Sequence, residues 1–158
     1  ASDVYKRQVL GRITVFGDLG RMIVPNPPNI LYGLLEPVFV EVRAPSWRRG
    51  GVFHPKIWFI KFESAVGEGS ESIYRLLILS RNITKDRSWD VALTLDGRMT
   101  GRNKAVNREL GELIASLPSL ATREMQPDRV AQIARLAEEI RKVAVSYTHL
   151  TLPTICSV

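Results

Sequence analysis

Residues 52–62 read VFHPKIWFIKF, and residues 73–82 read IYRLLILSRN. Both runs are rich in β-branched and aromatic residues, so they predict strands over Val52–Phe62 and Ile73–Leu79. In each run apolar side chains fall on both faces, which is typical of a strand inside a sheet that helices cover on both sides. These two strands, joined by a polar loop, decide the fold.

Weaker patterns on either side predict the remaining elements. Strands are expected at Arg12–Phe16, Val38–Val42 and Asp90–Leu95, the last of them ending at Asp96-Gly97, and helices at Asn29–Leu35, 106–117 and 127–143. Gly17-Asp18-Leu19-Gly20 is expected to form a turn. The alternation of strands with a helical C-terminal part predicts an α/β fold, a mixed β-sheet flanked by helices.

Polar side chains with chemical potential gather at the ends of these strands. His54 and Lys56 lie two residues apart and project to one face of their strand, as do Ser80 and Asn82. Pairing the strands would place an imidazole, an ammonium, a hydroxyl and an amide around one phosphate-sized space. Each of these side chains also has a structural interpretation: a hydrogen-bonded histidine, a lysine reaching to water, a serine without a special role and a turn asparagine.

The order His54-x-Lys56, Ser80-x-Asn82 and then Asp90 resembles the phospholipase D superfamily. The resemblance covers about Val38–Gly97, and the phrase LSRNITKDRSWDVALTLDG is similar to the nuclease branch. It implies one half of a phospholipase D-like α/β/α sandwich.

Two positions depart from the family's fuller motif. Lys61 stands where the family has an aspartate, and Leu79 stands where it has a glycine. The motif is thereby closer to the H-K-N form of the tyrosyl-DNA phosphodiesterase branch than to a lipid-hydrolysing member.

The resemblance implies a role for each residue. His54 would be the nucleophile, forming a phosphohistidine, and Lys56 would hold a non-bridging phosphate oxygen. Asn82 would donate a hydrogen bond to the phosphoryl oxygens, and Ser80 would support the same oxygens or position Asn82. Asp90 would orient the imidazole, or be a solvated carboxylate at the start of a strand. No metal and no cofactor is expected.

Only one H-x-K element is present, whereas enzymes of this superfamily bring two together. We expect the second, which would protonate the leaving group, to come from the missing part of the chain or from a second subunit.

The composition is compatible with a polyanionic partner. The net charge is +6, and it falls to +5 when Lys6, Arg7 and Asp3 are left out. Trp47, Arg48 and Arg49 could bind nucleic acid by stacking on a base and pairing with phosphates, or could form an ordinary solvated loop. No apolar run is long enough to span a membrane, so we expect a cytoplasmic protein without a membrane partner.

The two ends of the chain are related to each other as DNA. Residues 1–8 can be back-translated as GCG TCA GAT GTG TAT AAG AGA CAG, whose reverse complement in another frame encodes Val145–Thr151. The string resembles a transposon-end sequencing adapter, so residues 1–8 and 145–158 are interpreted as adapter artefact. Residues 9–118 are expected to form the catalytic half-domain, and 119–144 a helical continuation of the same or the next domain, as an internal fragment of a longer protein.

Excluding the ends removes Cys156 and His149. Residues 9–144 then contain no cysteine and one histidine, His54, so neither a disulfide scaffold nor a Cys/His zinc site can form there.

The sequence therefore predicts a phosphodiesterase acting on nucleic acid. Two alternatives stay open: a non-catalytic nucleic-acid-binding module of a larger helicase or restriction-type protein, and a lipid enzyme that transfers phosphatidyl groups.

Overall fold

The computed structural model describes residues 9–21, 33, 35–63, 72–81 and 91–151. The chain forms two compact units, each built from separate stretches of sequence. The first unit contains residues 1–54 and 112–136, and the second contains residues 55–111 and 137–158.

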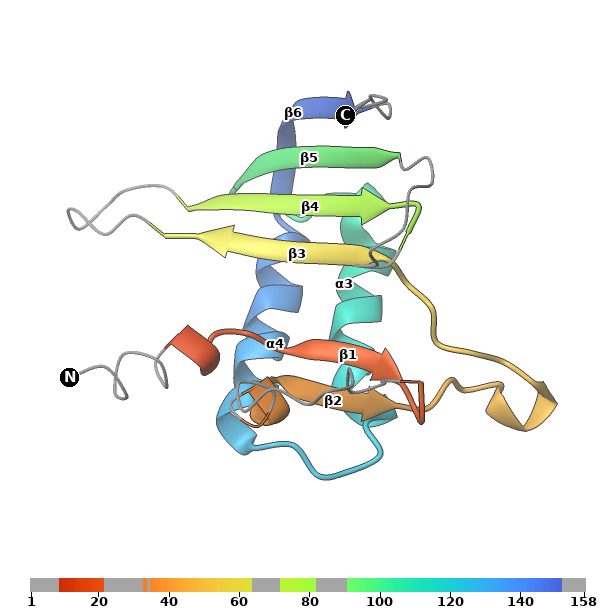
Figure 1. Ribbon diagram of the computed structural model, residues 1–158. Helices are drawn as coiled ribbons and strands as arrows, with labels where there is room; N and C mark the ends of the chain where they lie inside the picture. Colours follow the sequence, from red (N-terminus) through yellow and green to blue (C-terminus); the bar gives the residue numbers. More distant parts are fainter. Residues whose placement is uncertain (1–8, 22–32, 34, 64–71, 82–90, 152–158) are drawn as a thin grey trace. The chain divides into compact units, whose positions relative to one another are not determined.

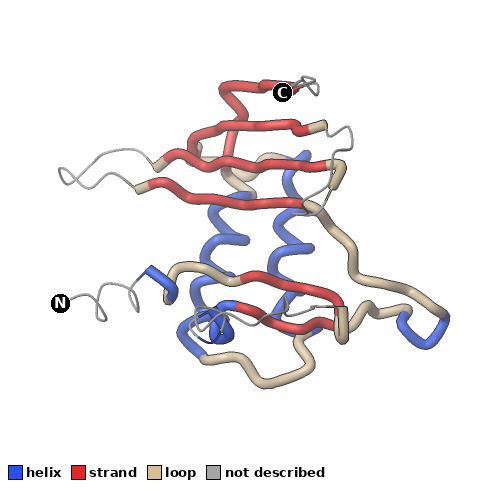
Figure 2. The backbone as a smooth tube through the Cα atoms, in the orientation of Figure 1, coloured by secondary structure: helices blue, strands red, loops and turns tan. Residues whose placement is uncertain are grey.

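The first unit contains a two-stranded parallel sheet. Strand β1 (Val15–Asp18) pairs with β2 (Phe39–Val42), with Val15 opposite Phe39 and Asp18 opposite Val42. Figure 2 shows the two strands side by side. The core of the unit consists of small and branched apolar side chains, Val38, Val42, Ala44, Ile114 and Ile133.

The second unit contains a four-stranded antiparallel sheet in the order β3-β4-β5-β6 (Figure 1). Its strands are β3 (Ile57–Phe62), β4 (Ile73–Leu79), β5 (Ala92–Met99) and β6 (Val143–Thr151). Ile57 lies opposite Ile78, and Leu79 lies opposite Ala92. The start of β3, the end of β4 and the start of β5 therefore lie at the same end of the sheet.

Two α-helices follow β5. They are α3 (Arg108–Ser116) and α4 (Pro127–Ile140), with the 3-10 turns η3 (Ala105–Asn107) and η4 (Leu117–Leu120) before and after α3. Pro127 suits the first position of α4 because an N–H there would have no partner within the helix. The amide of Asn107 donates to the carbonyls of Ile140 (2.8 Å) and Val143 (2.7 Å), which fixes the passage from α4 into β6.

The two faces of the antiparallel sheet differ in burial. Residues directly opposite each other in an antiparallel pair share a face. One face carries Phe59, Lys61 and Tyr74, and Tyr74 is only 2% exposed. The other carries Trp58 and Phe62, which are 46% and 45% exposed.

The prediction of an α/β fold is confirmed, and β4 has the predicted bounds. The strands nevertheless divide between two sheets, where we expected one, because the parallel pair and the antiparallel strands do not join. The prediction that both faces of the central strands are covered is wrong for the described residues, since Trp58 and Phe62 are half exposed. The helix expected at Asn29–Leu35 lies largely outside the described residues.

Several strand bounds also differ from the prediction. Strand β3 begins at Ile57 instead of Val52. Strand β1 includes Gly17-Asp18, which we expected to belong to a turn, and β5 includes Asp96-Gly97, where we expected the strand to have ended.

Part of the tail interpreted as adapter forms an edge strand. Residues 145–151 belong to β6, which pairs with β5 through a register shift at Asp96/Gly97. Main-chain hydrogen bonds of an edge strand depend little on side-chain identity, so pairing of this segment does not bear on its origin.

Candidate active site

Of the predicted catalytic residues, Lys56 and Ser80 lie next to strand ends. Lys56 directly precedes β3, and its carbonyl accepts a hydrogen bond from the N–H of Leu79 (2.8 Å). Lys56 is half-buried. The ladder between β3 and β4 thus brings Lys56 beside the residue that precedes Ser80.

His54-Pro55-Lys56 is not part of the strand, contrary to the prediction of a strand from Val52. Pro55 has no N–H to donate to a ladder, so the proline inside the motif is a physical reason for β3 to begin only at Ile57. His54 is exposed, and the division between the two units falls directly after it.

The main chain next to His54 is anchored by a residue that the sequence analysis did not select. The N–H of Phe53 donates to Oδ1 of Asp18 at 3.0 Å, and Asp18 is the last residue of β1. Asp18 also pairs with Arg21 at 3.4 Å. The carboxylate of Asp18 at the end of β1 was a possible sign of such a role. Its partner Phe53 could not be identified from the sequence, because it lies 35 residues away.

Ser80 is hydrogen-bonded to the main chain of Val91. Its N–H donates to the carbonyl of Val91 (3.0 Å), and its Oγ accepts from the N–H of Val91 (2.9 Å). These two bonds hold Ser80 beside Val91. Accepting from Val91 does not use the hydrogen of the Ser80 hydroxyl, so both roles predicted for Ser80 stay predictions.

Asn82 and Asp90 lie outside the described residues. Ser80 and Val91 flank the segment that contains them. The predicted roles of Asn82 and Asp90 therefore stay predictions.

Lys61, the residue at the position of the family's aspartate, takes part in a separate network. Its Nζ lies 2.9 Å from Oε1 of Glu139 and 3.1 Å from Oε1 of Glu63. Partial burial acts to lower the pKa of Lys61, but the hydrogen bonds to Glu139 and Glu63 outweigh it and raise the pKa above its usual value. The ammonium also lies 5.7 Å from the centre of the Tyr74 ring, so Lys61 connects β3, β4 and α4.

The basic loop ahead of His54 has a defined backbone. Trp47, Arg48 and Arg49 form the 3-10 turn η2 (Trp47–Arg49), and all three are exposed. Gly50 ends the turn at φ +80°, a conformation that favours glycine. A Cβ at Gly51 would collide with the side chain of Ser46, so the loop needs glycine there as well.

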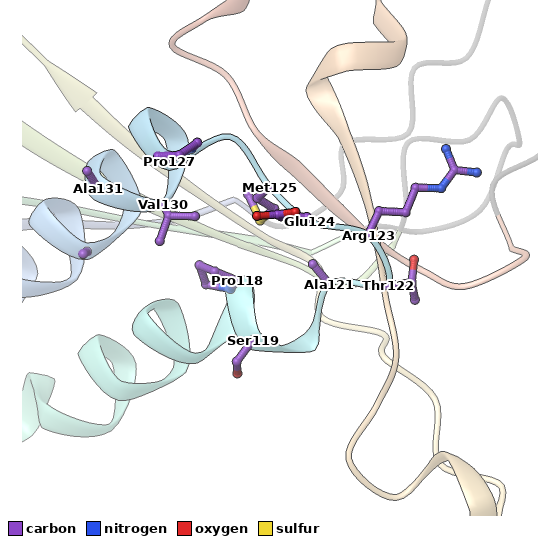
Figure 3. A pocket seen from close by; sticks show the side chains of 11 residues that line it. Pro118, Ser119, Ala121, Thr122, Arg123, Glu124, Met125, Pro127, Val130 and Ala131 are labelled. Carbon is purple, nitrogen blue, oxygen red and sulfur yellow. The ribbon is translucent and has the colours of Figure 1, made fainter.

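Two open hollows are lined by residues of the first unit. The larger, about 770 Å³, lies between η4 and the start of α4, and Figure 3 shows the side chain of Arg123 extending away from Pro118 and Val130. The smaller, about 390 Å³, is lined by Arg43, Trp47 and residues of η4. Of the predicted site residues in the described part of the chain, only Trp47 lines either hollow.

Across the described segments, no three His, Cys, Asp or Glu side chains gather as they would around a metal ion. None of the helices in those segments combines the length and the apolar character that crossing a membrane requires. No protein-family model, no curated protein and no solved structure matches this chain.

Proposed function

We propose that this chain carries one half-site of a phosphodiesterase of the phospholipase D superfamily, which acts on nucleic acid. The observation that supports the proposal most directly is the hydrogen bond between Leu79 and Lys56. It joins the residue before β3 to the last residue of β4, so Lys56 lies beside the residue that precedes Ser80, although the two are more than twenty residues apart in sequence.

In the proposed reaction a ring nitrogen of His54 attacks phosphorus, and the bond from phosphorus to the leaving oxygen breaks. Lys56 holds a non-bridging oxygen, and a general acid protonates the leaving oxygen. Water then attacks phosphorus and gives a proton to the group that protonated the leaving oxygen, the phosphorus–nitrogen bond breaks, and His54 is regenerated. The proposal assigns the general acid to a second H-x-K element, in a second copy or another segment of the protein, completing the α/β/α sandwich of the family.

An activated substrate tests the nucleophile without the general acid. Thymidine 5′-(p-nitrophenyl) phosphate releases p-nitrophenolate, which leaves without protonation. We expect one equivalent of p-nitrophenolate per chain and a thymidylyl group bound to His54, seen by intact-mass and peptide mass spectrometry.

The chain offers a matched control, because it has two histidines. His54→Gln should abolish both the burst and the label, whereas His149→Gln, on the edge strand β6, should retain them. Labelling that persists in His54→Gln, or its absence from the wild-type chain, would contradict the proposal.

A non-catalytic nucleic-acid-binding module is the second candidate. It is favoured by the exposed arginines next to Trp47, whose binding of nucleic acid would not require a catalytic His54. It predicts binding of nucleic acid with no thymidylyl label on any residue.

A further inference from the structure

The end of β2 and the basic loop place two arginines against one tryptophan. The guanidinium carbon of Arg43 lies 4.5 Å from the centre of the Trp47 ring, and that of Arg48 lies 5.4 Å from it. Both distances are within the range of a cation–π contact. Both arginines are also exposed, so a ligand can reach their N–H groups.

The backbone that carries this stack is held in place. The residue before Arg43, Val42, is completely buried and bridges to Ala121. The N–H of Arg43 donates to the carbonyl of Leu120 (2.9 Å), and the N–H of Trp47 donates to the carbonyl of Ala44 (3.0 Å). The arginine and the ring therefore start from fixed positions, which lowers the entropy lost when a ligand orders them.

The stack borders the hollow of about 390 Å³, whose lining contains one cation and no carboxylate. The lining residues are Arg43, Ala44, Pro45, Trp47, Ser119, Leu120, Ala121 and Thr122. The hydroxyls of Ser119 and Thr122 already donate to the carbonyls of Ser116 (2.7 Å) and Glu41 (3.1 Å). The positive charge in this hollow therefore comes from Arg43, and it complements an anion.

We propose that Arg43 and Arg48, held over Trp47, form a clamp for the phosphodiester backbone of nucleic acid. That the phosphate belongs to nucleic acid rests on the proposed function. Planar guanidinium groups bind phosphate oxygens through two parallel hydrogen bonds, and such contacts are independent of base sequence. Trp47 positions the arginines, in place of the base stacking that the sequence suggested.

The proposed clamp predicts that the arginines near Trp47 differ in their contribution to binding. Arg49 follows Arg48 directly, and its N–H donates to the carbonyl of Ser46 (2.8 Å) within the turn. Its guanidinium is not among the groups stacked on Trp47 in the described structure. Arg43 and Arg48 should therefore contribute more to binding than Arg49.

Fluorescence anisotropy with two labelled probes tests the clamp. One probe is a 20-nucleotide oligothymidylate, and the other is an abasic chain with the same number of phosphates. All proteins carry His54→Gln, so that no turnover interferes. We expect both probes to bind with dissociation constants within about twofold of each other, since the phosphates carry the interaction.

Arg43→Ala should weaken binding of both probes about five- to tenfold, and should reduce the slope of log K against log salt by about 0.7 for each phosphate that the protein no longer neutralises. Trp47→Leu should weaken both probes to a similar degree, whereas Trp47→Phe, which keeps a ring, should weaken them less. Arg135→Ala removes the same charge from an exposed position on α4 and should change affinity less than twofold. Circular dichroism checks that each variant is folded.

Several results would overturn the clamp: equal effects of Arg43→Ala and Arg135→Ala, loss of affinity in Trp47→Leu for the base-bearing probe alone, or no binding of either probe at low salt. These results test the clamp independently of the proposed phosphodiesterase. Thymidylyl labelling of His54 without an effect of Arg43→Ala would reject the clamp alone. Arginine-dependent binding without labelling would reject the phosphodiesterase alone.

Discussion

The two faces of the β3–β4 pair have similar apolar content but different surroundings. On one face Tyr74 is 2% exposed, its ring centre lies 6.4 Å from that of Phe59, and Lys61 beside it reaches Glu139 of α4. On the other face Trp58 and Phe62 are 46% and 45% exposed, and the polar contact is the Arg75–Asp96 pair. Apolar alternation shows which surfaces can be buried, but the contacts decide which of them stabilise the fold.

The largest expected effect is on the buried face. Tyr74→Ala removes a ring from a packed position, so we expect the free energy of unfolding to fall by about 3 kcal/mol. Phe62→Ala, on the exposed face of the neighbouring strand, should cost about 1 kcal/mol or less, because its ring keeps much of its contact with water. Urea unfolding followed by circular dichroism measures both. Equal losses would mean that the two faces are equally buried in solution.

The ion pair on the buried face should have an intermediate effect. Lys61→Met leaves the half-buried carboxylate of Glu139 without its hydrogen-bond donor, and we expect a loss of about 1 kcal/mol. Because the folded state raises the pKa of Lys61 above 10.5, the contribution of this pair is complete below that pH and is lost as the pH rises further.

Thermal unfolding between about pH 8 and pH 11 tests the sign of this effect, with the range set by the ordinary lysine pKa. The difference between the wild-type chain and Lys61→Met should be constant at first and shrink at the alkaline end. Lys104→Met, at a half-buried lysine outside this network, is the control. A difference that grows with rising pH would contradict the assignment.

The fold was predictable where a signal lies within one element. Strand β4 has its predicted bounds because a run that is apolar apart from Arg75 is enclosed by Ser72 and Ser80. Strand β5 extends past the predicted stop at Asp96-Gly97 for reasons that lie on other strands. Arg75 pairs with Asp96, and a Cβ at Gly97 would lie 2.5 Å from the carbonyl oxygen of Ala144, so only glycine fits.

In the candidate site, too, residues with a local sequence signal were predictable, and residues that depend on distant contacts were not. The motif residues His54, Lys56 and Ser80 are recognisable from spacing alone, whereas Asp18 and Arg43 become candidates only through contacts. Asp18 meets Phe53 across 35 residues, and the guanidinium of Arg43 matters because it lies over Trp47. Neither contact produces a pattern among neighbouring residues in the sequence, because the contacts depend on where β1 and β2 end.

The smallest expected effect is on the exposed face. Nε and Nη2 of Arg75 each donate to Asp96 at 2.7 Å, and these hydrogen bonds hold the pKa of Asp96 below its usual value. A carboxyl group whose pKa is lowered on folding stabilises the protein above its unfolded pKa, near 3.8, and loses that contribution as the pH falls through the folded value. Arg75→Gln should therefore lower the melting temperature slightly at neutral pH and by less at acidic pH.

Melting curves recorded from neutral pH down to about pH 3, below the ordinary aspartate pKa, test this prediction. Arg135→Gln, at an exposed arginine on α4, controls for the change in net charge. The difference between wild type and Arg75→Gln should shrink below about pH 4, while the effect of Arg135→Gln should show no such step. A loss at neutral pH as large as that of Tyr74→Ala would contradict the comparison of the two faces, because a solvent-accessible pair is screened whereas a buried ring is not.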